Sequence, residues 1–267
     1  DAEAVLSRVM PLAGGALRVG ITGVPGAGKS TLIEALGNAA IDCGHRVAVL
    51  SVDPSSTISG GSILGDKTRM ATLSHKPQAF VRPSPTVGRA GGVAPGTREA
   101  IYLCEAAGFD FIMVETVGVG QSELHVASMT DMFVLLLLPD AGDELQGIKR
   151  GVMELVDLVA VNKCDGELAA AGQRTVAEFA QALRLMPRHT SDWAVPVIGV
   201  SALTSEGIEG MLETIMRFCA CVLASGVHRE RRSDQAREWL WEEIRQGLLE
   251  RFFRDPALEA RAKTMED

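Results

Sequence analysis

The sequence predicts an α/β fold: a doubly wound, mainly parallel sheet with helices on both faces. Short apolar runs rich in β-branched residues recur along the chain, and stretches with helical spacing separate them. Near-continuous apolar character is typical of strands that are covered on both faces, as parallel strands are. The motifs with polar chemistry all follow such runs, so we expect them at the carboxyl edge of the sheet, where ligands bind.

The apolar runs predict six strands, which cover 16–22, 45–52, 109–115, 131–138, 155–162 and 195–201. Helical patterns lie between them at 29–42, 97–107, 145–155, 173–185 and 207–224, and a further amphipathic stretch covers 234–253. We therefore divide the chain into an N-terminal segment over 1–16, a nucleotide-binding domain over 17–225 and a C-terminal helical arm over 226–267.

Composition argues against two classes of partner. The formal net charge is -8, which disfavours nucleic acid and an anionic membrane surface. The longest apolar run, 132–139, has the length of a buried strand and is far from the roughly 18 residues of a membrane span. The five cysteines lack the paired spacing of zinc sites, which indicates free thiols in a reducing compartment.

A phosphate-binding loop is predicted by "GVPGAGKS", residues 23–30, which follows a strand and opens a helix. Its backbone N–H groups and the helix N-terminus can hold the phosphates of a nucleotide. Lys29 is expected to reach the β- and γ-phosphates, and the Ser30 hydroxyl to bind Mg²⁺. The predicted contacts with the nucleotide are Gly26, Ala27, Gly28, Lys29, Ser30 and Thr31.

Guanine is the base that "NKCD", residues 162–165, predicts. The Asp165 carboxylate can accept hydrogen bonds from both N1–H and the 2-amino group of guanine, whereas adenine presents an acceptor there. Asn162 can bond the other base edge, and the Lys163 stem can cover the ring. A backbone N–H of "SAL" can reach the guanine oxygen; these residues are Ser201, Ala202 and Leu203. The expected ligands are GTP and GDP.

Three further blocks, at 51–70, 115–123 and 143–151, resemble the GTPase family of methylmalonyl-CoA mutase-associated chaperones. That family also bears the name of an arginine/ornithine transport-system kinase. The resemblance runs from about residue 17 to about residue 253. It implies a GTP-hydrolysing homodimer that gates cofactor loading and reactivation of an adenosylcobalamin-dependent acyl-CoA mutase, of the methylmalonyl-CoA or isobutyryl-CoA type. The implied location is the bacterial cytoplasm, or the mitochondrial matrix in a eukaryote.

Three acids are expected around the metal. Asp53 ends the second predicted strand, Asp66 lies in a glycine-rich loop, and Glu115 replaces the aspartate of the usual Asp-x-x-Gly motif, as it does in the family. With Ser30 they form an oxygen-rich set that suits Mg²⁺ bound to phosphates. For Asp53 the alternative is a turn cap before Pro54. The resemblance adds Lys149 to Lys29, Asp66 and Glu115 as residues expected to act in hydrolysis.

Slow, partner-dependent hydrolysis is expected. Segments 54–69, 117–123 and 140–151 have the composition of nucleotide-ordered switches, and in one state Lys149 would approach the phosphates. Small signalling GTPases place a water-orienting Gln directly after the Asp-x-x-Gly glycine. Here that position is Val119, and Gln121 lies two residues later. We therefore expect the mutase to accelerate hydrolysis.

Two other functions stay open at this point. A metallochaperone GTPase would need metal-binding side chains, but the histidines are scattered, and Cys219 and Cys221 project about 200° apart on a helix, which favours core packing. A kinase of a transport protein would follow from the family's older name, although "NKCD" favours guanine. The helix at 234–253 is expected to mediate dimerisation, with packing on its own domain as the alternative.

Overall fold

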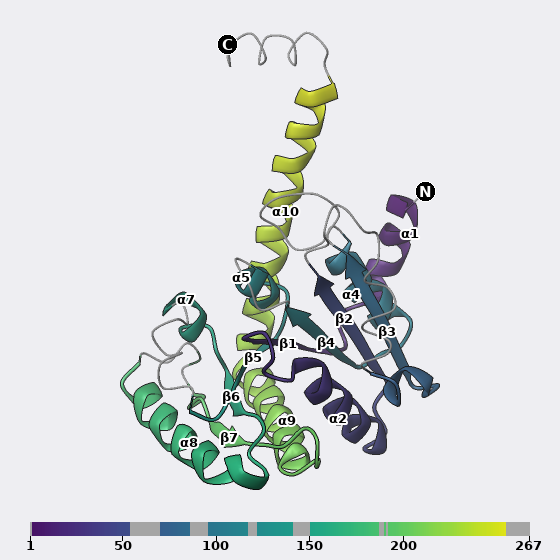
Figure 1. Cartoon of the computed structure of the whole chain (residues 1–267). Helices are drawn as coiled ribbons and strands as arrows, with labels where there is room; N and C mark the ends of the chain where they lie inside the picture. Colours follow the sequence, from purple (N-terminus) through teal and green to yellow (C-terminus); the bar gives the residue numbers. More distant parts are fainter. Residues whose placement is uncertain are drawn as a thin grey trace, which may run out of the picture. The chain divides into compact units, whose positions relative to one another are not determined.

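Seven parallel strands form the sheet of this protein, in the order β3-β2-β4-β1-β5-β6-β7 (Figure 1). The structure is a computed structural model, and it describes residues 2–53, 70–85, 96–116, 122–140, 150–186, 190 and 192–254. The chain divides into two compact units, Asp1–Ala224 and Ser225–Asp267. The sheet and its covering helices belong to the first unit.

The strands are β1 (Leu17–Gly23), β2 (Val47–Asp53), β3 (Ala79–Pro85), β4 (Phe111–Thr116), β5 (Met132–Leu137), β6 (Leu158–Val161) and β7 (Val197–Gly199). The helices of this unit are α1 (Ala2–Val9), α2 (Lys29–Asp42), α4 (Thr97–Ala106), α5 (Ser122–Ala127), α7 (Arg150–Met153), α8 (Ala169–Arg184) and α9 (Ile208–Ser225). Short 3-10 turns cover Met10–Leu12, Leu73–His75 and Gly166–Leu168. The parallel α/β fold expected from the sequence is confirmed.

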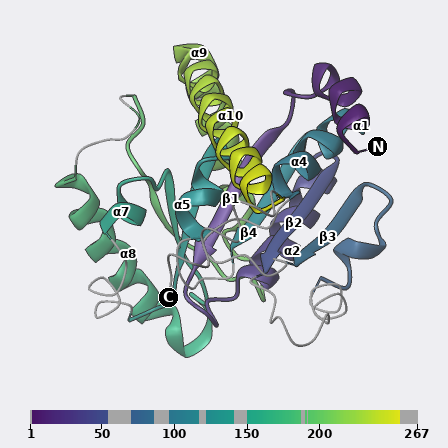
Figure 2. The same cartoon turned by 90° about the horizontal axis from the view of Figure 1, so that it is seen from above.

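Both faces of the sheet are covered. On one face, side chains of α4, α5, α7 and α8, among them Ile101, Val126 and Phe179, pack with strand residues in one buried cluster. Figure 2 shows α4 and α5 lying along the sheet on this side. On the other face, Gly37 of α2 lies against the side chains of Leu73 and Met113. Apolar side chains on both sides of each central strand explain why the strands read as continuous apolar runs.

A buried ion pair fixes the amino end of β1. The Arg18 guanidinium donates two hydrogen bonds to the Glu105 carboxylate of α4, at 2.8 and 2.9 Å. The Arg18 backbone N–H donates to the Asp131 carboxylate just before β5, at 2.9 Å. Loss of one partner in such a buried pair costs about 3–5 kcal/mol. The central strand is therefore held at the end opposite to the predicted site.

Strand β3 was not predicted, and its position explains why. Its sequence, "AFVRPSP", carries Pro83 and Pro85, which normally argue against a strand because proline has no N–H to donate. β3 pairs with β2 alone and forms one edge of the sheet, where the second hydrogen-bonding side needs no partner. The helix expected over 145–155 lies partly outside the described residues, and α7 ends at Met153.

The second unit is built on α10 (Val227–Arg254). The helix begins seven residues before the expected start, because the charge cluster at 228–232 is itself helical. Charged long side chains are good helix formers when water solvates them. Among the described residues no single helix has both the length and the apolar character of a bilayer span, although α9 and α10 pass that test of length and composition as a pair.

Candidate nucleotide site

The predicted site residues gather at the carboxyl edge of the sheet because the strands are parallel. The phosphate-binding loop leaves β1, and the two strands that pair with β1 are β4 and β5. Glu115 lies near the end of β4, and Asn162 directly follows β6. Sequence positions more than a hundred residues apart are thereby brought to one place.

Position 28 requires glycine for two reasons, its backbone conformation and the lack of room for a Cβ atom. Its φ is 88°, in the left-handed region, and it caps the N-terminus of α2. A Cβ at this position would lie 2.6 Å from Asn162 Nδ2. The phosphate-binding loop therefore packs directly on the "NKCD" motif, and only glycine allows this approach.

Lys29 is buried at the start of α2 and points back into the loop. Its Nζ donates hydrogen bonds to the carbonyls of Gly23 at 2.7 Å and Val24 at 3.2 Å. Burial lowers the pKa of Lys29, while the carboxylates of Glu115 and Glu123 oppose that shift. An ammonium held in a low-dielectric loop interacts strongly with a further anion, which suits a phosphate contact.

Glu115 accepts hydrogen bonds from two serines. The Ser30 hydroxyl donates to Oε1 at 3.1 Å, and the Ser51 hydroxyl donates to Oε2 at 3.4 Å. The carboxylate is buried, with 8% of the residue exposed. Of the predicted metal set, the structure therefore brings Ser30 and Glu115 into contact.

Asn162 joins three segments of the site. Its Nδ2 donates to the Ala27 carbonyl at 2.8 Å, and its Oδ1 accepts from the Ala202 backbone N–H at 3.0 Å. The side chain is buried, at 2% exposure. These two bonds use one of the two amide hydrogens and one lone pair of the oxygen, so the expected contact with the base stays a prediction. Asn162 acts as a brace between the phosphate-binding loop and the 201–203 loop.

Lys163 has a left-handed backbone, with φ of 61°, which is uncommon for a residue other than glycine. Its Nζ donates to the Gly26 carbonyl at 3.0 Å, so the side chain extends along the phosphate-binding loop. Asp165 follows with an extended backbone and precedes the 3-10 turn Gly166–Leu168. The half-buried Asp165 is thus available at the position where the sequence predicts the base.

Within the 201–203 loop the described contacts favour Leu203 as the base contact. The Ser201 N–H donates to the Glu206 carbonyl at 2.9 Å, and the Ala202 N–H donates to Asn162. Leu203 itself is exposed. We expect the Leu203 N–H to be the one of the three that reaches the guanine oxygen.

For several predicted site residues the roles are still predictions. Asp66, Val119, Gln121 and Lys149 lie outside the described residues. Asp53 is the last residue of β2, as expected, and its backbone pairs with Pro85 of β3. The roles predicted for these residues stay predictions.

Sequence reasoning missed two buried polar contacts. One is Ser51, a single polar residue inside the apolar run "VAVLSVD". The other is the hydrogen bond from the Thr116 hydroxyl to the Thr22 hydroxyl, at 2.9 Å, which links β4 to β1 below the phosphate-binding loop. Isolated hydroxyls in apolar strands are a usable signal, since a buried hydroxyl needs a partner.

Residues 1–257 match the family described as methylmalonyl Co-A mutase-associated GTPase MeaB. The chain belongs to this family. The mouse protein named methylmalonic aciduria type A homolog, mitochondrial, is 51% identical over 93% of this chain and 60% of its own length. GTPase ArgK of Escherichia coli K12 is 45% identical over 93% of this chain and 75% of its own length. The family confirms the resemblance found in the sequence, and with it a P-loop GTPase.

Two solved structures agree with the fold. The crystal structure of an LAO/AO transport system kinase superposes with a TM-score of 0.79 at 35% identity, over 98% of this chain and 78% of that one. HypB from Helicobacter pylori in complex with nickel superposes with a TM-score of 0.58 at 17% identity, over 81% of this chain and 92% of that one. At 17% identity, the likeness to HypB shows that the two proteins share a fold. It does not show that this GTPase binds a metal as HypB does.

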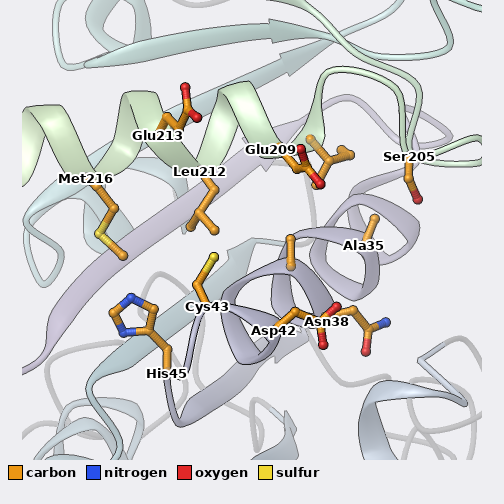
Figure 3. A pocket seen from close by; sticks show the side chains of 12 residues that line it. Ala35, Asn38, Asp42, Cys43, His45, Ser205, Glu209, Leu212, Glu213 and Met216 are labelled. Carbon is orange, nitrogen blue, oxygen red and sulfur yellow. The ribbon is translucent and has the colours of Figure 1, made fainter.

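A cavity of about 630 Å³ lies between α2 and α9, and none of its lining residues is a predicted nucleotide contact (Figure 3). It combines Asp42, Glu209 and Glu213 with Cys43 and His45, all of which are types of metal ligand. Yet in the described part of this GTPase no group of three or more His, Cys, Asp or Glu residues comes close enough to hold a metal ion.

Proposed function

We propose that this GTPase controls cofactor loading and reactivation of an adenosylcobalamin-dependent acyl-CoA mutase, through the state of its bound guanine nucleotide. The family supports a mutase as the partner. The single structural observation in favour is the bracing of the site. Asn162 and Lys163 tie the phosphate-binding loop to the guanine-recognition segments. The base and the phosphates of the nucleotide would then contact segments that are hydrogen-bonded to one another.

Each predicted switch follows a strand that ends at the carboxyl edge of the sheet. Segment 54–69 follows Asp53 at the end of β2, and segment 117–123 follows Thr116 at the end of β4. Segment 140–151 begins at Asp140, whose N–H donates to the Thr175 hydroxyl of α8. All three anchors lie at the carboxyl edge of the sheet. A γ-phosphate on the phosphate-binding loop would therefore act on three segments at once, as nucleotide switches require.

Mg²⁺ fits the residues that the structure brings together. A hydroxyl that donates its proton to a carboxylate, as Ser30 does to Glu115, presents its lone pairs for a cation. Mg²⁺ prefers oxygen ligands and in nucleotide sites takes few from the protein, so a cluster of three protein acids is not needed. When bound, the ion would neutralise charge on the phosphates. Ser30 would hold it, and Glu115 would orient Ser30.

Intrinsic hydrolysis is expected to be slow, because Val119 replaces the water-orienting Gln of small signalling GTPases. Lys29 would stabilise the phosphate charge. Any group that orients the attacking water would come from a switch segment after the partner has bound. The partner thereby acts on the rate of hydrolysis as well as on the shape of the surface.

Co-precipitation with candidate mutases tests the proposal. The purified protein is loaded with GDP or with a non-hydrolysable GTP analogue and mixed with methylmalonyl-CoA and isobutyryl-CoA mutases. We expect one mutase to bind, with an affinity that depends on the nucleotide, and to accelerate GTP hydrolysis. A matched control is Lys29→Ala, which is expected to lose the nucleotide dependence. If neither mutase bound in either nucleotide state, the proposed control of a mutase would be excluded. The conclusion that the protein binds GTP would be unaffected.

A further inference from the structure

Ser51 is a buried hydroxyl to which the family resemblance assigns no role. It lies in β2, with 5% of the residue exposed, between apolar neighbours. Its register partner across the sheet is Glu115 of β4. Registered residues of parallel strands project their side chains to the same face. The two side chains are therefore neighbours by strand pairing, independent of any loop.

Glu115 is held from two directions. Oε1 accepts from Ser30 on α2, at 3.1 Å, and Oε2 accepts from Ser51 on β2, at 3.4 Å. A carboxylate rotates about its last bond unless both oxygens have partners. With Oε2 bonded to Ser51, Oε1 is directed toward Ser30. The 3.4 Å distance is long for an O–H···O bond, so the contribution of Ser51 is expected to be modest.

We propose that Ser51 is a positioning residue for the Mg²⁺ end of the nucleotide site: it orients Glu115, which in turn orients the Ser30 hydroxyl toward the cation. This inference rests on the proposed Mg²⁺ role of Ser30 and Glu115. It predicts that Ser51 affects binding of guanine nucleotide in the presence of Mg²⁺ and leaves Mg²⁺-independent binding unchanged. A residue that only fills space in the core would change both equally.

Ser51→Val and Ser51→Thr form a matched pair, because valine and threonine have nearly the same shape and only threonine retains the hydroxyl. The measurement is fluorescence of a labelled GDP during a Mg²⁺ titration and again in excess EDTA. We expect Ser51→Val to raise the Mg²⁺ midpoint by about three- to ten-fold, the range of an ordinary hydrogen bond, because the 3.4 Å bond is too long for the full strength of one to a charged group. Ser51→Thr is expected to stay within about two-fold of the wild type, because it keeps that bond. Affinity in EDTA is expected to be the same for all three proteins.

Glu115→Ala completes a double-mutant cycle, because alanine removes both oxygens that Ser51 and Ser30 can bond. If Ser51 acts through the carboxylate, Ser51→Val is expected to have no further effect in the Glu115→Ala background. Thermal unfolding of each variant checks the fold, and Ser51→Ala replaces Ser51→Val if the larger side chain prevents folding.

Equal midpoints for Ser51→Val and Ser51→Thr would overturn the role of Ser51, as would a valine effect that persists without the Glu115 carboxylate. In both cases a Mg²⁺-dependent wild type leaves the proposed function standing. A wild-type protein whose GDP binding does not respond to Mg²⁺ would overturn the proposed metal site and, with it, the role of Ser51.

Discussion

Asn162 makes two protein contacts that its motif does not predict. The Asn-Lys-x-Asp pattern indicates guanine recognition, and the base was expected to bond the Asn162 side chain. The structure shows that its amide also connects Ala27 with Ala202. The selection of the base is therefore tested most directly at Asp165, the residue of the motif predicted to accept from both guanine donors.

Asp165→Asn is expected to exchange the base preference. A carboxylate accepts from the two donors of guanine, whereas an amide can donate to the carbonyl that xanthine carries in place of the 2-amino group. We expect GDP affinity to fall on the order of 100-fold, the loss of one hydrogen bond to a charged group, because the amide keeps one of the two acceptors; we also expect a gain for xanthosine diphosphate. Competition titrations with both nucleotides measure the change. An unaltered GDP affinity would show that Asp165 does not contact the base.

Cys104 is expected to resist alkylation. Burial raises the pKa of its thiol to about 11, with the neighbouring Arg82 opposing that shift. The unfolded thiol loses its proton near pH 9 and the folded one near pH 11, so folding stability falls as pH rises through this window and is unaffected below it. At pH 8, iodoacetamide labelling of Cys104 should be about 100-fold slower than in the unfolded chain, because the thiolate is the reactive form.

Peptide mass spectrometry after timed labelling measures both rates. The exposed Cys43 is the internal control and is expected to react in the folded protein. Fast labelling of Cys104 under native conditions would contradict its burial.

Helix α8 supports the loop that is predicted to bind the base. Gly172 of α8 lies against Cys164, so a Cβ there would overlap the Cys164 Sγ. The loop that carries Lys163 and Asp165 is thus seated directly on the helix. Nothing in the helical pattern of 173–185 indicates this contact, because it depends on where the loop folds back.

Gly172→Ala is therefore expected to displace the loop that is predicted to bind the base. We expect a loss of about 1–3 kcal/mol of stability, the usual cost of overpacking, and weaker GDP binding. Cys164→Ala in the same chain should restore part of both, because it removes the overlapping sulfur. The measurements are thermal unfolding and GDP titration.

Gly210→Ala in α9 is the matched control. A Cβ there meets nothing within 4 Å, so alanine should stabilise the helix by about 0.5–1 kcal/mol. If Gly172→Ala behaved like Gly210→Ala, the close packing of α8 on the loop would be wrong.

Elements differ in how far the sequence predicts them. α2 covers the expected 29–42, because the phosphate-binding loop fixes its start and its apolar spacing its length. β3 was missed, because its prolines are tolerated only at an edge, and edge position is a property of the whole sheet.

For the whole molecule, α10 raises the question of oligomeric state. Several large apolar side chains of this helix are between 38% and 61% exposed; they are Leu240, Trp241, Ile244, Leu248, Leu249 and Phe252. Their spacing places them along one broad face of the helix. An apolar face of this kind is typical of protein–protein contacts.

We propose that this face mediates a homodimer, and Leu240→Glu with Leu248→Glu is expected to give a monomer. Charges in an apolar interface are costly unless paired. Light scattering coupled to size exclusion measures the mass, and GDP affinity should stay unchanged. Glu243→Gln, on the polar face, is the control, and this variant should have the same mass in solution as the wild type. A variant of unchanged mass would exclude dimerisation through this face.

The sequence by itself determined the chemistry of this protein and the class of its fold. The motifs "GVPGAGKS" and "NKCD" can be recognised from the sequence because their chemistry depends on residues that are close together in the chain. The spacing of apolar residues indicates strands and helices where these elements are long enough. The tertiary structure decided which of these residues support one another. Asn162 became a brace and Ser51 a partner of Glu115 because strand order and register, which depend on packing across the whole sheet, place them side by side.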